Sequence, residues 1–194
     1  MRHTLVALLQ DRPGVLHRAV SLLRRRAFNI ESLAVGHSEA PGVSRMTLVV
    51  DADDVQQVVK QLYRLIEVLK VTDVTNGPTV EREAALLKVH APTARRSEIM
   101  ALANAFEAKV VDVGASTVVL EVTGSPGKVD KLAELTRRFG LKELVRTGRI
   151  VMTRGSQAVQ PPGREKEHGG AGGDRDADGA TPATAWAWQA DGSA

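Results

Sequence analysis

An internal repeat constrains the fold of this chain more than any other feature of its sequence. Residues 3–74 and residues 85–152 show the same order of patterns, namely strand, helix, strand, strand, helix, strand. Asn76, Gly77 and Pro78 form a turn signal between the two units. Right-handed crossovers place both helices of such a unit on one face of a four-stranded sheet. The sequence therefore predicts an α+β fold with two tandem ferredoxin-like βαββαβ units, over residues 4–78 and 79–154.

The expected elements follow from the spacing of apolar residues. Alternation of apolar and polar residues indicates strands, and apolar residues three or four positions apart indicate helices. In the first helix the predicted buried stripe consists of Leu16, Ala19, Val20 and Leu23. The first unit is expected to have strands at 3–9, 29–35, 45–50 and 68–74, and helices at 15–26 and 54–66. The second unit is expected to have strands at 85–90, 109–113, 117–122 and 144–152, the last with a candidate hairpin turn at 147–148, and helices at 97–107 and 128–139.

The predicted strand order leaves the first sheet open in two places. Strands one and three would lie in the centre, and strands two and four would form the edges. The face opposite the helices and the edge at strand two would then be uncovered. Because an open edge strand tends to pair with a strand of another chain, we expect a homodimer formed through the first unit.

The last forty residues, 155–194, differ in composition from the rest of the chain. They contain eight of the seventeen glycines and no Leu, Ile, Phe, Met or Tyr. Such a segment buries too little apolar surface to offset its ordering entropy, so a disordered tail is predicted. Trp186 and Trp188 lie in this tail, and they either belong to a low-complexity end or form a short docking motif.

Composition excludes several classes of protein. The chain has no cysteine, which excludes disulfides, thiolate nucleophiles and cysteine-based metal sites. No apolar run approaches the roughly 18 residues of a membrane span, and the run at 5–9 is too short for a signal segment, so a cytoplasmic chain without a membrane partner is expected. The net charge is only +3, from dispersed basic residues. RNA-recognition domains share the βαββαβ order but need aromatic residues on their central strands, which are missing here, so no nucleic-acid partner is expected.

The sequence DRPG, residues 11–14, connects the first strand to the first helix. Pro13 suits a helix start, and Gly14 allows a close approach of the backbone to a ligand. The N–H groups of Gly14, Val15 and Leu16 would form a small anion site at the positive end of the helix dipole. Asp11 could hold an ammonium group beside it, and the two groups together match the head of an amino acid. Alternatively, Asp11 and Pro13 only form the turn and cap the helix.

Asn29 opens the predicted edge strand of the first unit, and its amide can donate and accept hydrogen bonds. If two such edges pair, Asn29 would lie near the DRPG loop of the neighbouring chain. The alternative is an ordinary turn residue after the helix. The sequence contains no HExxH motif, no Ser/His/Asp constellation and no paired carboxylates in a predicted cleft, so we expect no catalytic and no metal-binding residues.

Several segments resemble the regulatory small subunit of acetolactate synthase, over roughly residues 3–155. They are LVALLQDRPGVLHRAVSLLRRRAFNIESLAVG, SRMTLVV, KQLYRLIEVLKV, VEREAALLKV, KVVDVG, SPGKVDKL and GLKELVRTG. The resemblance implies an ACT domain at 4–78 followed by the C-terminal domain of the family. It implies a non-catalytic chain that activates a large catalytic subunit and confers feedback inhibition by a branched-chain amino acid, most often valine. Thiamine diphosphate, Mg and FAD would be bound by the large subunit, with no cofactor in this chain.

The resemblance also implies an effector site for valine. Its residues would be Asp11, Gly14, Val15, Leu16, Asn29 and Ile30. Many members of the family have Asn where this chain has Asp11, which bears on affinity and on the choice among valine, leucine and isoleucine. The valine carboxylate would lie on the helix N-terminus, its ammonium group would face Asp11 or Asn29, and its side chain would enter a gap lined by Leu16 and Ile30. An ACT-type sensor of a different biosynthetic enzyme is the alternative function.

Overall fold

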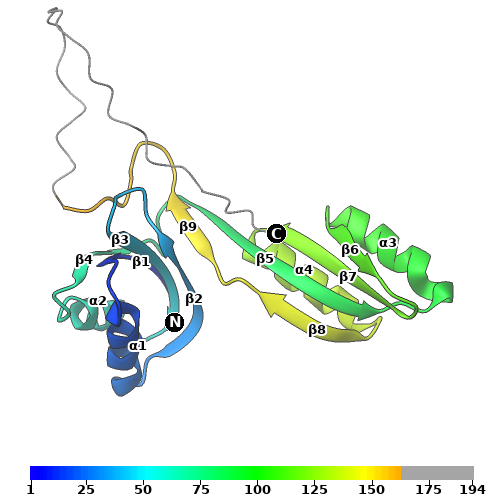
Figure 1. The fold of residues 1–194 in the computed structure, drawn as a ribbon, viewed down its shortest axis with the longest axis horizontal. Coiled ribbons are helices and arrows are strands. Elements are labelled where there is room, and N and C mark those ends of the chain that lie inside the picture. Colours follow the sequence, from blue (N-terminus) through cyan, green and yellow to red (C-terminus); the bar gives the residue numbers. More distant parts are fainter. Residues whose placement is uncertain (163–194) are drawn as a thin grey trace, which may run out of the picture. The chain divides into compact units, whose positions relative to one another are not determined.

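The computed structural model describes residues 1–162 of the chain (Figure 1). The described part contains two ferredoxin-like units, each with the βαββαβ order predicted from the sequence. In the first unit the elements are β1 (Arg2–Gln10), α1 (Val15–Arg25), β2 (Asn29–His37), β3 (Val43–Asp51), α2 (Val55–Leu62) and β4 (Val68–Asp73). In the second they are β5 (Thr79–His90), a 3₁₀ turn η1 (Thr93–Arg95), α3 (Arg96–Ala105), β6 (Lys109–Val113), β7 (Thr117–Gly124), α4 (Pro126–Arg137), β8 (Leu141–Arg146) and β9 (Ile150–Thr153).

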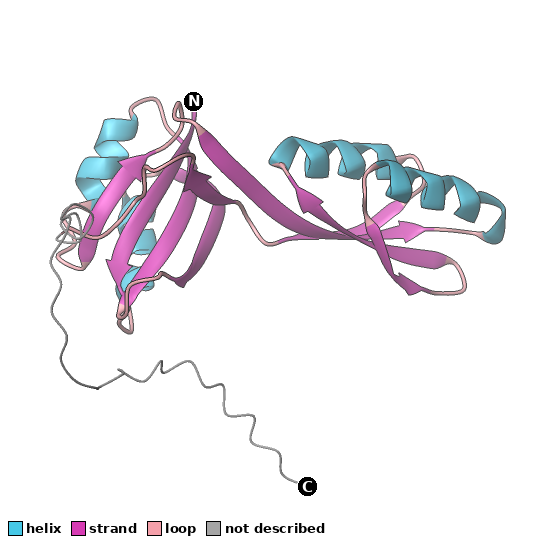
Figure 2. Ribbon diagram, turned by 90° about the horizontal axis from the view of Figure 1, so that it is seen from above, coloured by secondary structure: helices cyan, strands magenta, loops and turns pink. Residues whose placement is uncertain are grey.

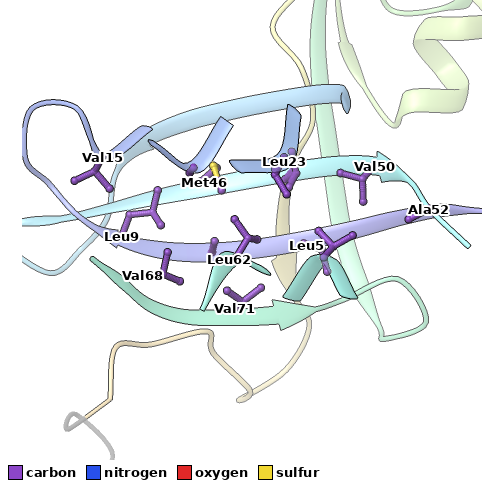
Figure 3. Packing of buried hydrophobic residues seen from close by; sticks show 14 residues of the cluster. Leu5, Leu9, Val15, Leu23, Met46, Val50, Ala52, Leu62, Val68 and Val71 are labelled. Carbon is purple, nitrogen blue, oxygen red and sulfur yellow. The ribbon is translucent and has the colours of Figure 1, made fainter. Parts of the chain in front are cut away.

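The first sheet has the strand order β2-β3-β1-β4 and is antiparallel throughout. This order confirms β2 as an edge strand. Alternate residues of β1 and β3, such as Leu5 and Met46, face α1 and α2 and are fully buried (Figure 3). They form the core of the unit with Val15, Ala19 and Leu23 of α1 and with Val58 and Leu62 of α2.

The two helices of this unit begin in different ways. At α2 the side chain of Asp54 accepts a hydrogen bond from the N–H of Gln56 at 2.9 Å, which is the expected N-cap. At α1 the cap residue is Gly14, with φ of 84° and no side-chain cap. The buried stripe of α1 is Val15, Ala19, Leu22 and Leu23. The prediction of Leu16 and Val20 in this stripe was wrong, because the helix is rotated so that Leu16 is 39% exposed.

The second sheet has the order β6-β7-β5-β8, and α3 and α4 lie on the same side of it (Figure 2). Its core contains Leu87, Ile99, Leu120 and Leu132, all fully buried. The expected hairpin at residues 147–148 does not form, because β8 and β9 each pair with β5 instead of with each other. β5 is consequently long: residues 79–82 pair with β9, and residues 83–90 pair with β7.

The outer face of the first sheet is partly covered, which corrects the expectation of an open face. Val6 and Leu8 of β1 are fully buried there, on the side away from the helices. They pack in one cluster with Val151 of β9 and with Val159. Residues 155–162, which the sequence analysis assigned to the tail, are described by the structure, and Val159 among them is buried. Residues 163–194, with Trp186 and Trp188, lie outside the described residues.

Candidate effector-binding site

The DRPG loop leads directly into α1 and leaves part of the helix N-terminus available for a ligand. The amides of Gly14 and Leu16 donate to no acceptor within residues 1–162. The N–H of Val15, in contrast, donates to the carbonyl of Arg12 at 3.3 Å, so the prediction that it points to a ligand was wrong. Gly14 has a left-handed backbone that L side chains rarely adopt. This conformation turns the chain so that two free amides remain at the positive end of the helix.

Asp11 is held in place beside this helix start. Its N–H donates to the carbonyl of Gly42 at 2.8 Å, and its Oδ1 accepts from the hydroxyl of Ser44 at 3.0 Å. Its Oδ2 lies 3.1 Å from Nδ1 of His37. Asp11 is nevertheless 41% exposed, so the carboxylate keeps acceptor sites for a further donor. A fixed carboxylate with free acceptor capacity suits the ammonium group of an amino acid.

Arg18 is a candidate site residue that the sequence analysis missed. Its Nη1 lies 3.3 Å from the position that a Cβ on Gly14 would occupy, and its Nη2 is 2.6 Å from Oε1 of Glu67. The guanidinium therefore lies at the helix N-terminus, where its charge is already paired with the carboxylate of Glu67. The spacing from Gly14 could have revealed it, because residues four positions apart share one face of a helix.

Asn29 and Ile30 lie far from the DRPG loop in the same chain. Asn29 is exposed and pairs with Asp51 of β3, whereas His37, which contacts Asp11, is at the other end of β2. Eight residues of extended strand separate the two ends by about 26 Å. Ile30 packs against the first core near the end of α1, while Leu16 is on the first turn of that helix. One chain therefore brings Asp11, Gly14 and Leu16 together, but it does not bring Asn29 and Ile30 to them.

Within residues 1–162, no group of three or more His, Cys, Asp or Glu side chains has a geometry suited to a metal ion. None of the described helices is both long and apolar enough to span a bilayer.

Comparisons with known proteins agree with this arrangement of domains. Residues 5–70 match the model of the AHAS small subunit-like ACT domain, and residues 82–155 match the model of the small subunit of acetolactate synthase. A probable acetolactate synthase small subunit of Archaeoglobus fulgidus is 50% identical over 159 residues, which cover 81% of this chain and 99% of the relative. The chain belongs to the acetolactate synthase small subunit family.

Other members of the small subunit family extend this result. The acetolactate synthase small subunit of Bacillus subtilis is 44% identical over 160 residues, which cover 81% of this chain and 93% of the relative. The crystal structure of the small subunit from Thermotoga maritima superposes with a TM-score of 0.73 at 37% identity, over 81% of this chain and 99% of that chain. The predicted resemblance to this family is therefore confirmed, and so is the tandem fold.

Proposed function

We propose that this small subunit binds a branched-chain amino acid, with valine as the leading candidate, and thereby regulates a large catalytic subunit of acetolactate synthase. The observation that carries the proposal is the start of α1, where a left-handed Gly14 leaves two free amides between Asp11 and Arg18. The two free amides at the positive end of the helix suit a carboxylate, and Asp11 suits an ammonium group. In a member of this family, such a paired site is best explained by a free amino acid.

The site is completed by a second copy of the chain. β2 is an edge strand of the first sheet, contacted by Gly148 and Arg149 at Ser32 and Leu33, and its main-chain edge would pair with β2 of a second copy. In an antiparallel pair centred on Leu33, Asn29 of the partner subunit would be opposite His37, which contacts Asp11. The same pairing would bring Ile30 of the partner subunit to the exposed Leu16. The two halves of the expected site, which are about 26 Å apart along β2 of one chain, are then adjacent across the dimer.

The proposed pocket accounts for both affinity and regulation. Burying the isopropyl group of valine between Leu16 and the partner's Ile30 would contribute about 1.5–3 kcal/mol. Because each site contains groups from both chains, the ligand stabilises one arrangement of the dimer over others. A coupling free energy of about 1–3 kcal/mol between this arrangement and the large subunit is enough for inhibition.

The catalytic chemistry belongs to the partner in this proposal. Relatives are named small subunits, and a small subunit works together with a larger chain. The large subunit would carry thiamine diphosphate, Mg and FAD, while this chain raises its activity and makes it sensitive to the effector. The chain by itself would be non-catalytic.

Isothermal titration of the purified chain with valine, leucine and isoleucine tests the proposal. We expect saturable binding of at least one of the three. Asp11→Ala should weaken that binding about 10- to 100-fold, because a charge-assisted hydrogen bond contributes about 1.5–3 kcal/mol. Asp112→Ala, on exposed β6 of the second unit, is the matched control and should bind normally. Wild-type chain that binds none of the three amino acids, and leaves the large subunit insensitive to them, would refute the proposal.

A further inference from the structure

A groove on the outer face of the first sheet has no role in the proposed effector site. It has a volume of about 510 Å³. Residues of β2 and β3 form one wall, and β9 and the start of β5 form the other. This volume is in the range of protein sites that bind ligands. The lining residues are Ala34, Val35, Gly36, His37, Arg45, Thr47, Val80, Arg82, Ile150, Val151 and Met152.

The surface of the groove is mainly apolar and exposed. On β9, Ile150 is 60% exposed and Met152 is 68% exposed. They are paired across the ribbon with Arg82 and Val80 of β5, so the four side chains share one face. Exposed Met and Ile side chains gathered in a groove are typical of a surface that another molecule covers.

Two arginines add positive charge to this apolar surface. Arg45 donates from Nη2 to the carbonyl of Val151 at 2.8 Å, and Arg82 donates from Nη1 to the carbonyl of Glu81 at 2.8 Å. Within residues 1–162, neither guanidinium has a carboxylate oxygen within 4.0 Å. Burial lowers the pKa of Arg45, which is half-buried beside the apolar wall. Neither cation therefore forms an ion pair at contact distance, although the carboxylate of Glu39 opposes the effect of burial on the pKa of Arg45.

The charge of the groove argues against a second copy of this chain as its occupant. The lining residues include two arginines and no carboxylate, so a contact between two such grooves would gather four guanidinium groups in one interface without a counter-charge. A complementary occupant must be apolar and acidic and must come from a different chain.

The groove also reaches the candidate effector site. His37 lines its end, and Nδ1 of His37 is 3.1 Å from Oδ2 of Asp11. An amino acid bound at Asp11 and a protein segment in the groove would therefore contact the same side chain. This position suits a contact through which the bound effector influences a partner.

We infer that the groove is the docking site for a segment of the large subunit that carries apolar side chains and at least one carboxylate. Apolar side chains of the segment would cover Ile150 and Met152, and its carboxylate would pair with Arg82 or Arg45. This inference rests on the proposed function, because it takes the large subunit as the partner.

Binding of the full-length chain to the purified large subunit, measured by biolayer interferometry, tests the inference. Arg82→Glu and Met152→Asp change exposed side chains, and each is expected to weaken the complex at least tenfold. Arg137→Glu, at the exposed end of α4, and Ile66→Asp, which replaces an exposed apolar residue, are the matched controls. Both controls should bind the large subunit with the wild-type affinity. Thermal unfolding of each variant checks that the fold is retained.

The outcomes separate this inference from the proposed function. If the wild-type complex forms but the groove variants bind as tightly as the controls, the groove is not the docking site, and the effector proposal is unaffected. If the groove variants instead shift the dimerisation constant of the isolated chain, the occupant is a second copy and the inference is wrong. If valine, leucine and isoleucine all fail to bind but the groove variants lose the large subunit, the docking site stands and the effector proposal fails. If wild-type chain forms no complex, both are refuted.

Discussion

Gly148, in the connection between β8 and β9, offers a direct test of the contact between the two ferredoxin-like units. Its φ is 85°, and a Cβ added there would lie 3.0 Å from the carbonyl oxygen of Leu33 and 3.1 Å from Oγ of Ser32, both on β2. The next residue, Arg149, donates its N–H to the same Ser32 hydroxyl at 2.9 Å. We predict that Gly148→Ala destabilises the protein by forcing this connection away from β2.

The size of the effect comes from two terms. An L side chain in the left-handed region costs about 1–2 kcal/mol. A Cβ at 3.0 Å from a backbone oxygen adds an overpacking cost of about 1–3 kcal/mol, because a main-chain carbonyl in a strand cannot move as freely as a side chain. The total expected loss for Gly148→Ala is therefore about 2–5 kcal/mol.

Gly42→Ala is the matched control, because it carries only the cost of an L side chain in the left-handed region. Gly42 has φ of 73°, but a Cβ there would meet no atom within 4 Å. Thermal unfolding followed by circular dichroism should show a lower Tm for Gly148→Ala than for Gly42→Ala. The difference is expected to be about 2–12 °C, since each kcal/mol shifts Tm by about 2–4 °C in a chain of this size. Equal losses in the two variants would show that the connection does not press against β2.

Two predictions concern the cores and caps. Leu132→Ala in α4, a fully buried position, should destabilise the second unit by about 2–5 kcal/mol in urea unfolding, whereas Leu86→Ala, 45% exposed on β5, should change it by less than about 0.5 kcal/mol. Similar losses for the two leucines would contradict the packing described here. Asp54→Ala should lower the free energy of unfolding of the first unit by about 0.5–2 kcal/mol, because it removes the cap on the N–H of Gln56. Asp54→Asn should keep most of this stability. If Asp54→Ala leaves the free energy of unfolding unchanged in the same assay, the cap is not formed.

The strand order of the first unit could be predicted from the sequence, because apolar periodicity and crossover handedness leave few alternatives. The position of β9 could not. Its partner, residues 79–82 of β5, is about seventy positions away in the chain and has the polar sequence TVER. Long-range pairing of short strands leaves no local pattern, so the covering of Val6 and Leu8 by Val151 was missed.

At the candidate site, the sequence predicted the local backbone at the start of α1 but not the contacts around it. The sequence DRPG indicated a helix start with free amides, and Gly14 has the backbone that such a start needs. The rotation of α1 was not predictable, since Leu16 and Leu22 both fit a helical spacing and only tertiary packing decides which is buried. The contacts of Asp11 with Ser44 and His37 were missed for a similar reason, because they depend on the register of β2 and β3.

Mixing two inactive variants tests the central claim, a site shared between two chains, most directly. Asp11→Ala and Asn29→Ala chains should each bind the effector weakly when alone. In the heterodimer, one site receives both changes and the other receives neither. Titration of the re-equilibrated mixture should therefore restore tight binding, up to one site per heterodimer, with the affinity of the wild-type chain. If the mixture binds no better than either variant alone, Asp11 and Asn29 do not form one site across the dimer, and the account is wrong.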